Sequence, residues 1–263
     1  MNKGPGRLGT ILGGAYRLER LIGEGGMGSV YEASHTRLPR RFAVKLLNAD
    51  VLSNREVFER FQREAEIASS LGDDHIVQVV DFNYTEDGVP YMVLELLVGE
   101  DLAERLESRG RMSLAQTATI LEQISGALEV AHQHGIVHRD LKPQNLFVAR
   151  KMNGAPLVKI LDFGISKATG AAAVGQMNLT DSATVLGSPL YMSPEQMRSA
   201  RSVDARSDIW ALGVILYELL AGKVPFDGET VTELCLKVVI EKESPLAEHR
   251  PELPAGLAEI VQR

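Results

Sequence analysis

The chain has 263 residues, of which 24% are charged and 44% are hydrophobic, a composition typical of a soluble globular protein. Its formal net charge of −7 argues against nonspecific nucleic-acid binding, because no overall basic field attracts phosphate backbones. The single cysteine, Cys235, excludes an internal disulfide and favours a reducing compartment. No signal peptide is evident, and the most apolar stretch, residues 209–221, is too short to span a bilayer. We therefore expect a cytoplasmic protein with no nucleic-acid partner and no membrane contact from this part of the chain.

The first part of the chain has the pattern of a β-sheet with one helix. Residues 1–15 are glycine-rich and are expected to form a flexible tail. Strand-like runs of apolar residues follow in residues 16–47, 75–82 and 90–97. Between the first two of these regions, Ser53 and Glu56 form a capping box that opens a predicted helix over residues 53–71. Residues 16–97 are therefore predicted to form a small β-rich lobe.

Helical patterns dominate from residue 98 to residue 263. The predicted helices are residues 113–135, 209–221 and 230–241. Ser113 and Gln116 form a capping box at the start of the first helix, and Gly222 ends the second. Residues 165–193 show no periodicity and exceed the usual loop length, so we expect this segment to be functional or disordered. The predicted fold class is α+β, with a small β-rich lobe followed by a larger helical lobe.

A glycine motif lies near the start of the predicted sheet. Residues 23–28 read GEGGMG, which is the pattern G-x-G-x-x-G. A dinucleotide-binding fold needs a helix directly after these glycines, but residues 29–33 have the pattern of a strand. The glycines are therefore predicted at a hairpin tip, where backbone N–H groups can approach phosphates without a Cβ in the way. The alternative is a flexible β-turn.

Lys45 lies inside the strand-like run FAVKLL. A lysine within an apolar strand is unusual, because a buried ammonium group needs an anionic partner. Glu64 in the predicted helix is one candidate partner, and a phosphate group is another. The alternative is a lysine that faces outward from an edge strand.

The most informative stretch is residues 136–148, which read IVHRDLKPQNLFV and enclose many polar groups between apolar ends. Asp140 and Asn145 lie within it, and Asp162 begins the triplet DFG after the next apolar run. Asp162 and Asn145 offer oxygen ligands of the kind that Mg²⁺ prefers, while Asp140 can orient or deprotonate a hydroxyl group. Together with the upstream glycines and lysine, this combination is far more specific than any of its parts.

With these motifs in this order, the sequence resembles the eukaryotic-like (Hanks-type) serine/threonine protein kinases, and the phrase IGEGGMGSVYEA is similar to the bacterial branch. The resemblance extends from Tyr16 to the last residue. It implies a bilobal fold whose helical lobe is incomplete at the C-terminus. It also implies transfer of the γ-phosphoryl group of ATP to serine or threonine hydroxyls of protein substrates, with Mg²⁺ or alternatively Mn²⁺.

The resemblance assigns a set of residues to the ATP site. The implied members are Ile22, Gly23, Gly25, Gly28, Val30, Ala43, Lys45, Leu94, Glu95, Leu97, Asp101 and Leu146. The glycines would cover the phosphates, and Lys45 would hold the α- and β-phosphates and pair with Glu64. Val30 and Ala43 would lie against the adenine. Leu94 would be the gatekeeper, Glu95 and Leu97 the hinge, and Asp101 a ribose contact.

The resemblance also assigns the chemistry. The implied catalytic residues are Asp140, Lys142, Lys45 and Glu64, and the implied metal ligands are Asn145 and Asp162. Asp140 would be the catalytic base, and Lys142 would lie near the γ-phosphate, a lysine that tyrosine kinases usually lack. His132, His134 and His138 suggest a metal site by spacing alone, but the first two end a predicted helix and the third belongs to the implied catalytic loop.

An activation segment is implied from Asp162 to the triplet Ser193-Pro194-Glu195, in which the family usually has alanine in place of Ser193. Thr184 matches the usual regulatory phosphosite, and Thr180 and Ser182 are further candidates. Ser188 matches a position that contacts the catalytic loop. Arg139, Lys167 and Arg60 could form a basic pocket for a phosphothreonine. The alternative is that these hydroxyl groups are solvated loop residues.

The sequence departs from the family at its end. Family members continue past residue 263 and supply an arginine for the glutamate that matches Glu195, so we expect a fragment of a longer protein with a buried carboxylate left without a partner. A membrane anchor beyond residue 263 stays open. The rival functions are a small-molecule kinase, a nucleotide-binding pseudokinase-like scaffold and an inactive fragment. Expected partners are protein substrates and, for self-phosphorylation, a second copy of the chain.

Overall fold

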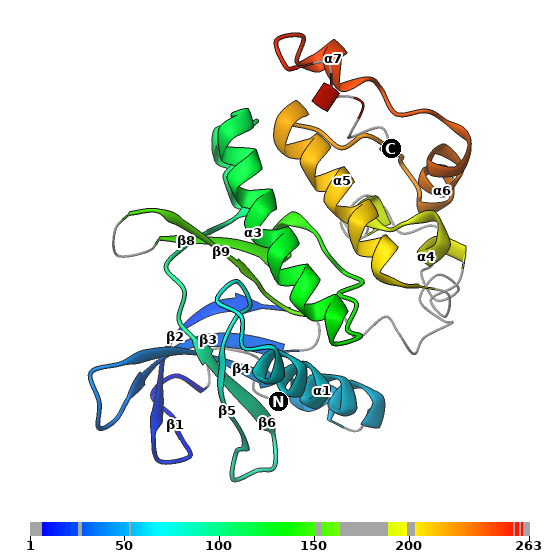
Figure 1. Cartoon of the computed structure of the whole chain (residues 1–263). Coiled ribbons are helices and arrows are strands. Elements are labelled where there is room, and N and C mark those ends of the chain that lie inside the picture. Colours follow the sequence, from blue (N-terminus) through cyan, green and yellow to red (C-terminus); the bar gives the residue numbers. More distant parts are fainter. Residues whose placement is uncertain are drawn as a thin grey trace. The chain divides into compact units, whose positions relative to one another are not determined.

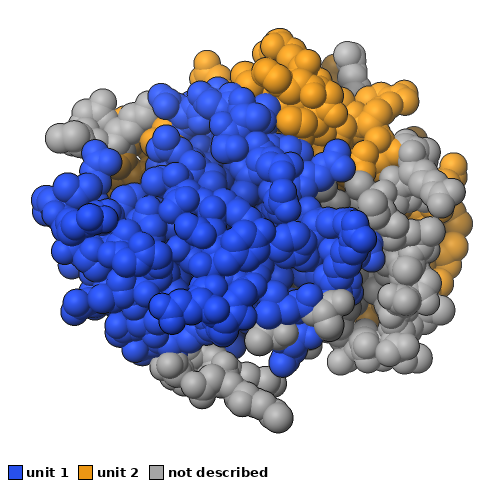
Figure 2. Space-filling model, turned by 90° about the horizontal axis from the view of Figure 1, so that it is seen from below, with its two compact units in different colours: residues 1–98 blue, residues 99–263 orange. Residues whose placement is uncertain are grey.

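The computed structural model describes residues 7–25, 28–52, 54–150, 154–163, 189–198, 203–254, 256–257 and 259. The chain forms two compact units, Met1–Val98 and Gly99–Arg263 (Figure 2). The first unit is built on an antiparallel sheet and the second mainly on helices (Figure 1). The predicted α+β class with a β-rich lobe and a helical lobe is confirmed.

A six-stranded antiparallel sheet forms the first unit, with the strand order β1-β2-β3-β4-β6-β5. Its elements are β1 (Ile11–Leu12), β2 (Tyr16–Glu24), β3 (Gly28–His35), β4 (Arg41–Leu47), the 3-10 turn Ala49–Val51, α1 (Arg55–Leu71), β5 (Val79–Tyr84) and β6 (Pro90–Glu95). One face of the sheet buries Leu18, Val44 and Val93. On the other face, Phe61 and Ala65 of α1 pack with Met92 of β6.

Residues 7–15 differ from the expected tail, while residues 1–6 lie outside the described residues. Strand β1 pairs with β2, and the backbone N–H of Gly9 donates to the carbonyl oxygen of Leu18 at 2.7 Å. Leu12 is only 3% exposed, and Gly13 and Gly14 adopt positive φ angles of 54° and 68° in the turn between the strands. Glycine adopts such angles without strain, so a composition that indicates a loose tail here forms a tight hairpin.

Helix α1 begins one residue later than its predicted cap implies. The side chain of Asn54 accepts hydrogen bonds from the backbone N–H groups of Glu56 and Val57, so Asn54 is the N-cap. Ser53, the predicted cap, lies outside the described residues. Phe61 and Ala65 are among the buried residues of α1, and the helix ends at Gly72 in the left-handed conformation.

A buried carboxylate bridges three strands of this sheet. Glu32 of β3 is 6% exposed and accepts hydrogen bonds from Arg20 Nη2 of β2 at 2.6 Å and from Arg41 Nη1 of β4 at 2.7 Å. The hydrogen bond from Arg20 lowers the pKa of Glu32 below its ordinary value, burial opposes this shift, and Arg41 adds to it. The ionised form of Glu32 is therefore the form that stabilises the fold.

We expect Glu32→Gln to lower the free energy of unfolding by about 1–2 kcal/mol at pH 7. A carboxyl group whose pKa is lowered by folding stabilises fully above its ordinary pKa of 4.5, and this contribution is lost as the pH falls through the lowered value. The difference between wild type and variant should therefore shrink below about pH 4.5. Urea denaturation from pH 7 to pH 3 measures it, with Glu19→Gln, an exposed carboxyl of β2, as the control. A difference that stays constant with pH would contradict this expectation.

The second unit combines helices with a small sheet. Its elements are β7 (Gly99–Asp101), α2 (Leu102–Arg109), α3 (Leu114–Gln133), the 3-10 turn Pro143–Asn145, β8 (Leu146–Arg150), β9 (Pro156–Ile160), the 3-10 turn Pro189–Tyr191, α4 (Pro194–Arg198), α5 (Ala205–Ala221), α6 (Val231–Ile240) and α7 (Leu246–His249). The sheet has the order β7-β8-β9, and α3 and α5 lie side by side (Figure 1).

The local signals for the helices of this unit hold. The capping box of Ser113 and Gln116 opens α3, and the hydroxyl group of Thr230 caps α6. Gly222 ends α5, but this helix starts at Ala205, earlier than predicted, with Asp204 as its cap. In the part of the chain that the structure describes, no helix combines the length and the apolar character that crossing a membrane requires.

Candidate active site

The register of the sheet brings the predicted ATP-site residues of the first unit to one face. Val30 is paired with Lys45, and Ala43 with both Glu32 and Leu94. Directly paired residues share a face of a sheet, and so do residues two apart along a strand. Val30, Ala43, Lys45 and Leu94 therefore lie on the same face, as an adenine and phosphate site in this unit requires.

Lys45 forms the predicted ion pair. Its Nζ lies 2.8 Å from Oε1 of Glu64 in α1, with side-chain exposures of 15% and 19%. Strand β4 lies between β3 and β6, so Lys45 is on a central strand. The alternative of an outward-facing lysine on an edge strand is therefore wrong. The pair holds the ammonium group of Lys45 on a central strand of the sheet, where it can bind an anion.

The three motif glycines have different structural requirements. A Cβ added to Gly28 would lie 2.3 Å from the carbonyl oxygen of Leu46, so strand pairing alone demands glycine there. At Gly23 and Gly25 the nearest atoms would be 3.8 Å and 4.0 Å away, so nothing else in the described structure excludes a side chain. An added Cβ at either position would meet nothing closer than ordinary van der Waals contact, so phosphate groups have room to approach this backbone.

The remaining predicted ATP-site residues occupy varied places. Glu95 exchanges hydrogen bonds with Gln78, through its backbone N–H at 3.1 Å and its carboxylate at 2.9 Å. In the second unit, Asp101 caps α2 by accepting from the N–H groups of Ala103 and Glu104. Leu146 of β8 is fully buried. Ile22 is exposed and Leu97 is half-buried. The ribose role of Asp101 and the hinge role of Glu95 and Leu97 stay predictions.

The implied catalytic loop contains a strained residue. Arg139 has φ 66°, and it is the one residue other than glycine with positive φ among those the structure describes. This conformation costs about 1–2 kcal/mol for a residue with a side chain. It persists only where surrounding contacts hold it.

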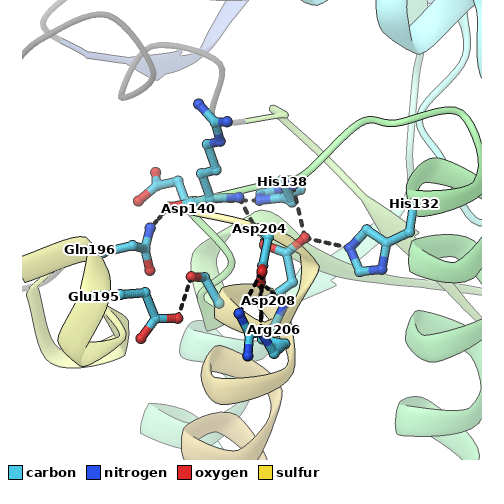
Figure 3. A network of polar contacts seen from close by, with 10 residues as sticks. His132, His138, Asp140, Glu195, Gln196, Asp204, Arg206 and Asp208 are labelled. Atoms are coloured by element: carbon cyan, nitrogen blue, oxygen red, sulfur yellow. Dashed lines mark hydrogen bonds and ion pairs between the residues drawn. The ribbon is translucent and has the colours of Figure 1, made fainter. Parts of the chain in front are cut away.

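Asp208 of α5 supplies the main contacts that hold this loop (Figure 3). The backbone N–H of His138 donates to its Oδ2 and that of Arg139 to its Oδ1, both at 2.9 Å. His132 of α3 contacts Oδ2 at 2.8 Å. Asp208 is 1% exposed, so one buried carboxylate ties the loop to two helices. Sequence reasoning missed this residue, although an acidic residue at the start of a strongly apolar helix is a signal that could have found it.

Asp140 and Lys142 form an ion pair on the implied catalytic loop. Nζ of Lys142 lies 3.0 Å from Oδ2 of Asp140. The side-chain amide of Asn145 donates to the carbonyl oxygen of Asp140 at 2.8 Å, and the carbonyl oxygen of Asn145 accepts from the N–H of Leu161 at 2.9 Å. The loop thus joins the predicted base to both predicted metal-ligand positions, because Asp162 follows Leu161 directly.

His138 is a neutral, buried support of this loop. It is fully buried, its ring centroid lies 5.0 Å from that of Phe163, and its Nδ1 accepts from the N–H of Asp140 at 3.3 Å. Burial lowers the pKa of His138, although nearby carboxylates act in the opposite direction. No cluster of three or more His, Cys, Asp and Glu side chains suited to a metal occurs within the described ranges. The three histidines instead have separate contacts.

Asn145 and Asp162 supply the donor set that a hard cation prefers, an amide oxygen and a carboxylate. Asn145 is buried and is held by hydrogen bonds at its backbone carbonyl oxygen and its side-chain amide nitrogen. Asp162 is exposed. These two residues therefore fit Mg²⁺ by their chemistry. The structure also holds an ammonium group at Lys45, which fits an anionic nucleotide.

Residues 16–256 match the protein kinase domain. The chain belongs to the protein kinase family. Among curated relatives, it is 39% identical to the serine/threonine-protein kinase pkn3 of Myxococcus xanthus over 93% of this chain and 44% of that protein. It is 39% identical to PrkC of Bacillus subtilis over 97% of this chain and 38% of the relative. It is 40% identical to PknA of Mycobacterium tuberculosis over 97% of this chain and 57% of that protein. The kinase chain thus spans about half the length of these relatives or less.

The predicted regulatory residues of the kinase lie mostly outside the described residues. Thr180, Ser182, Thr184, Ser188 and Lys167 all belong to this group. Arg60 of α1 is paired with Glu56 one turn earlier on the same helix. The backbone N–H of Arg139 donates to Oδ1 of Asp208. The basic pocket for a phosphothreonine stays a prediction.

Glu195 corrects one expectation. It was expected to be a buried carboxylate without a partner, but it is half-buried and accepts a hydrogen bond from Ser207 Oγ at 2.7 Å. Burial acts to raise its pKa, but hydrogen bonds from Ser207, from its own backbone and from Ser193 outweigh burial and lower it. Glu195 is therefore stabilised as an anion by hydroxyl and backbone donors.

Proposed function

We propose that this chain is the catalytic domain of a serine/threonine protein kinase, which transfers the γ-phosphoryl group of ATP to hydroxyl groups of protein substrates. The observation that carries the proposal is the ion pair of Asp140 and Lys142 on a loop whose strained backbone is anchored to Asp208. The ion pair of Lys45 and Glu64 supports it. So do the names of the relatives, which are serine/threonine-protein kinases.

In this proposal, Asp140 orients the substrate hydroxyl group and accepts its proton as the new oxygen–phosphorus bond forms and the bond to the ADP oxygen breaks. Lys142 offsets the charge on the transferred group, which is the role that separates this class from tyrosine kinases. Lys45 holds the α- and β-phosphates, and Glu64 keeps the lysine in place. Catalysis then rests on positioning and on charge stabilisation.

The nucleotide would be held in the first unit by Val30, Ala43 and Leu94 on the adenine side and by the backbone at Gly23 and Gly25 on the phosphate side. Asn145 and Asp162 would hold Mg²⁺, or Mn²⁺ as the alternative. When bound, such a cation neutralises charge on the phosphate oxygens.

Regulation is part of the proposal. Phosphorylation of Thr184, with Thr180 and Ser182 as further sites, would activate the domain, and Arg139 would contact the added phosphate. A second copy of the chain is the proposed enzyme for this step, and the proposed location is the cytoplasm. The pseudokinase alternative is not favoured, because every predicted catalytic position is filled. The match to the protein kinase domain argues against a small-molecule kinase.

Mass spectrometry tests the function directly. The purified chain is incubated with Mg²⁺ and ATP, alone and with casein, beside an Asp140→Asn control. We expect phosphate on serine and threonine residues of casein and on Thr184 or its neighbours, and none with the control. A folded chain that binds ATP and adds no phosphate anywhere would instead support the pseudokinase alternative.

A further inference from the structure

The short helix α4 begins with a capping box that the family resemblance does not imply. Residues 193–196 read SPEQ, which is the pattern S-x-x-Q with proline at the first helical position. The backbone N–H of Ser193 donates to Oε1 of Gln196 at 3.0 Å, and the N–H of Gln196 donates to Oγ of Ser193 at 3.4 Å. The backbone N–H of residue 193 therefore holds the side chain of Gln196, and the hydroxyl group of Ser193 holds the backbone N–H of Gln196.

Ser193 is itself anchored to α5. It is fully buried, and its hydroxyl group donates to Oγ of Ser207 at 3.0 Å, while Ser207 donates to Glu195 at 2.7 Å. The two serines thus connect the start of α4 to the helix that carries Asp208. This anchoring gives the capping box a fixed position relative to the catalytic loop within the second unit.

The other end of the Gln196 amide reaches the catalytic loop (Figure 3). Because Oε1 is held by Ser193, Nε2 is oriented outward, and it donates to the carbonyl oxygen of Arg139 at 2.8 Å. Arg139 is the strained residue directly before Asp140. Arg139 and Gln196 are both half-buried.

The contact restrains the peptide group that joins Arg139 to Asp140. Its carbonyl oxygen accepts from Gln196, and its N–H donates to Nδ1 of His138 at 3.3 Å. A peptide group held on both sides cannot rotate to relieve the strain at Arg139, and its orientation sets where the side chain of Asp140 begins.

We propose that Gln196 is a positioning residue for Asp140, acting through the carbonyl group of Arg139. The inference rests on the proposed function, because it gives Gln196 a part in the same phosphoryl transfer. Gln196 directly follows the triplet 193–195, which ends the predicted activation segment. Its contact with Arg139 therefore connects the end of that segment to the catalytic loop.

The substitution Gln196→Glu separates the two contacts. Glutamate serves equally well at this position of a capping box, so the contact with Ser193 N–H is kept. A carboxylate cannot donate to the carbonyl oxygen of Arg139, so the second contact is lost. The matched control is Gln123→Glu. Gln123 of α3 bridges two backbone groups of β9 in the same way, accepting from Val158 N–H at 2.9 Å and donating to the carbonyl oxygen of Pro156 at 3.4 Å.

Two readouts are measured on wild type, both variants and Asp140→Asn. Hydrogen–deuterium exchange of peptides from residues 136–145 should be about fivefold faster in Gln196→Glu and unchanged in Gln123→Glu. With casein as substrate, kcat of Gln196→Glu should fall about tenfold, with KM for ATP and the melting temperature close to wild type. Gln123→Glu should keep the wild-type kcat.

Unchanged exchange in Gln196→Glu would overturn the proposal, as would equal changes in both variants or a wild-type kcat despite faster exchange. A purely structural role for Gln196 would lower the melting temperature and leave kcat per folded molecule unaltered, which would also overturn it. If wild type transfers no phosphate, the proposed function fails. The exchange of residues 136–145 then still decides whether Gln196 holds the loop.

Discussion

Asp140→Asn is expected to lower kcat about 10³-fold, with ATP affinity changed by less than about threefold. Asparagine has nearly the same shape as aspartate but cannot accept the proton of the substrate hydroxyl group. It also removes the charge that faces Lys142 at 3.0 Å. The hydrogen bond from Asn145 uses the backbone carbonyl group of residue 140, so it should survive the change. Single-turnover phosphorylation of casein and fluorescence titration with ATP measure the two quantities.

The control for this result is the folded state of the variant. The melting temperature of Asp140→Asn should stay near that of wild type, because residue 140 is at a loop position whose anchors are the neighbouring backbone groups. A variant that retains more than about a tenth of the wild-type kcat would exclude Asp140 as the base. A variant that loses ATP binding together with kcat would indicate that Asp140 supports the fold of the site instead.

Features encoded within a few neighbouring residues could be predicted from the sequence. The capping box of Ser113 and Gln116 and the helix stop at Gly222 both occur where the pattern indicates. The ion pair of Lys45 and Glu64 is an exception, since the two residues are 19 apart in the chain; it is predictable because a lysine in an apolar strand needs an anion and the next helix carries one.

Features that depend on the packing of distant segments escaped prediction. Strand β1 pairs with β2 because Leu12 enters the core, which a local glycine content does not reveal. Asp208 and His138 are 70 residues apart in the chain, and Gln196 and Arg139 are 57 apart. Both contacts end on backbone groups, whose positions no side-chain pattern encodes. The SPEQ box was visible in the sequence, but the further contact of its glutamine was not.

The difference between Gly28 and its neighbours has the same origin. All three motif glycines were assigned to phosphates on the basis of resemblance. Only the register of β3 on β4 shows that the carbonyl group of Leu46 already requires glycine at position 28. No such contact exists at Gly23 or Gly25 in the described structure. Substitutions at these two positions would therefore test phosphate binding.

Asp208→Asn is the second large effect, and it acts on both stability and catalysis. The carboxylate accepts from the N–H groups of His138 and Arg139 and contacts His132. Asparagine has one acceptor oxygen, so its NH₂ group must face at least one of these donors in a buried site. We expect the free energy of unfolding to fall by about 3 kcal/mol and kcat to fall at least about tenfold, since Arg139 loses an anchor.

The matched control is Asp204→Asn, four residues earlier at the cap of the same helix. Asp204 is exposed and accepts from the N–H of Arg206, and asparagine caps a helix as well as aspartate does, so this variant should lose less than about 0.5 kcal/mol. Urea denaturation and kcat with casein compare the two. If Asp208→Asn were as stable and as active as Asp204→Asn, the strained turn at Arg139 would have to be held by Gln196 and His138 without the carboxylate. The buried network at α5 would then be a consequence of packing and not the anchor of the catalytic loop.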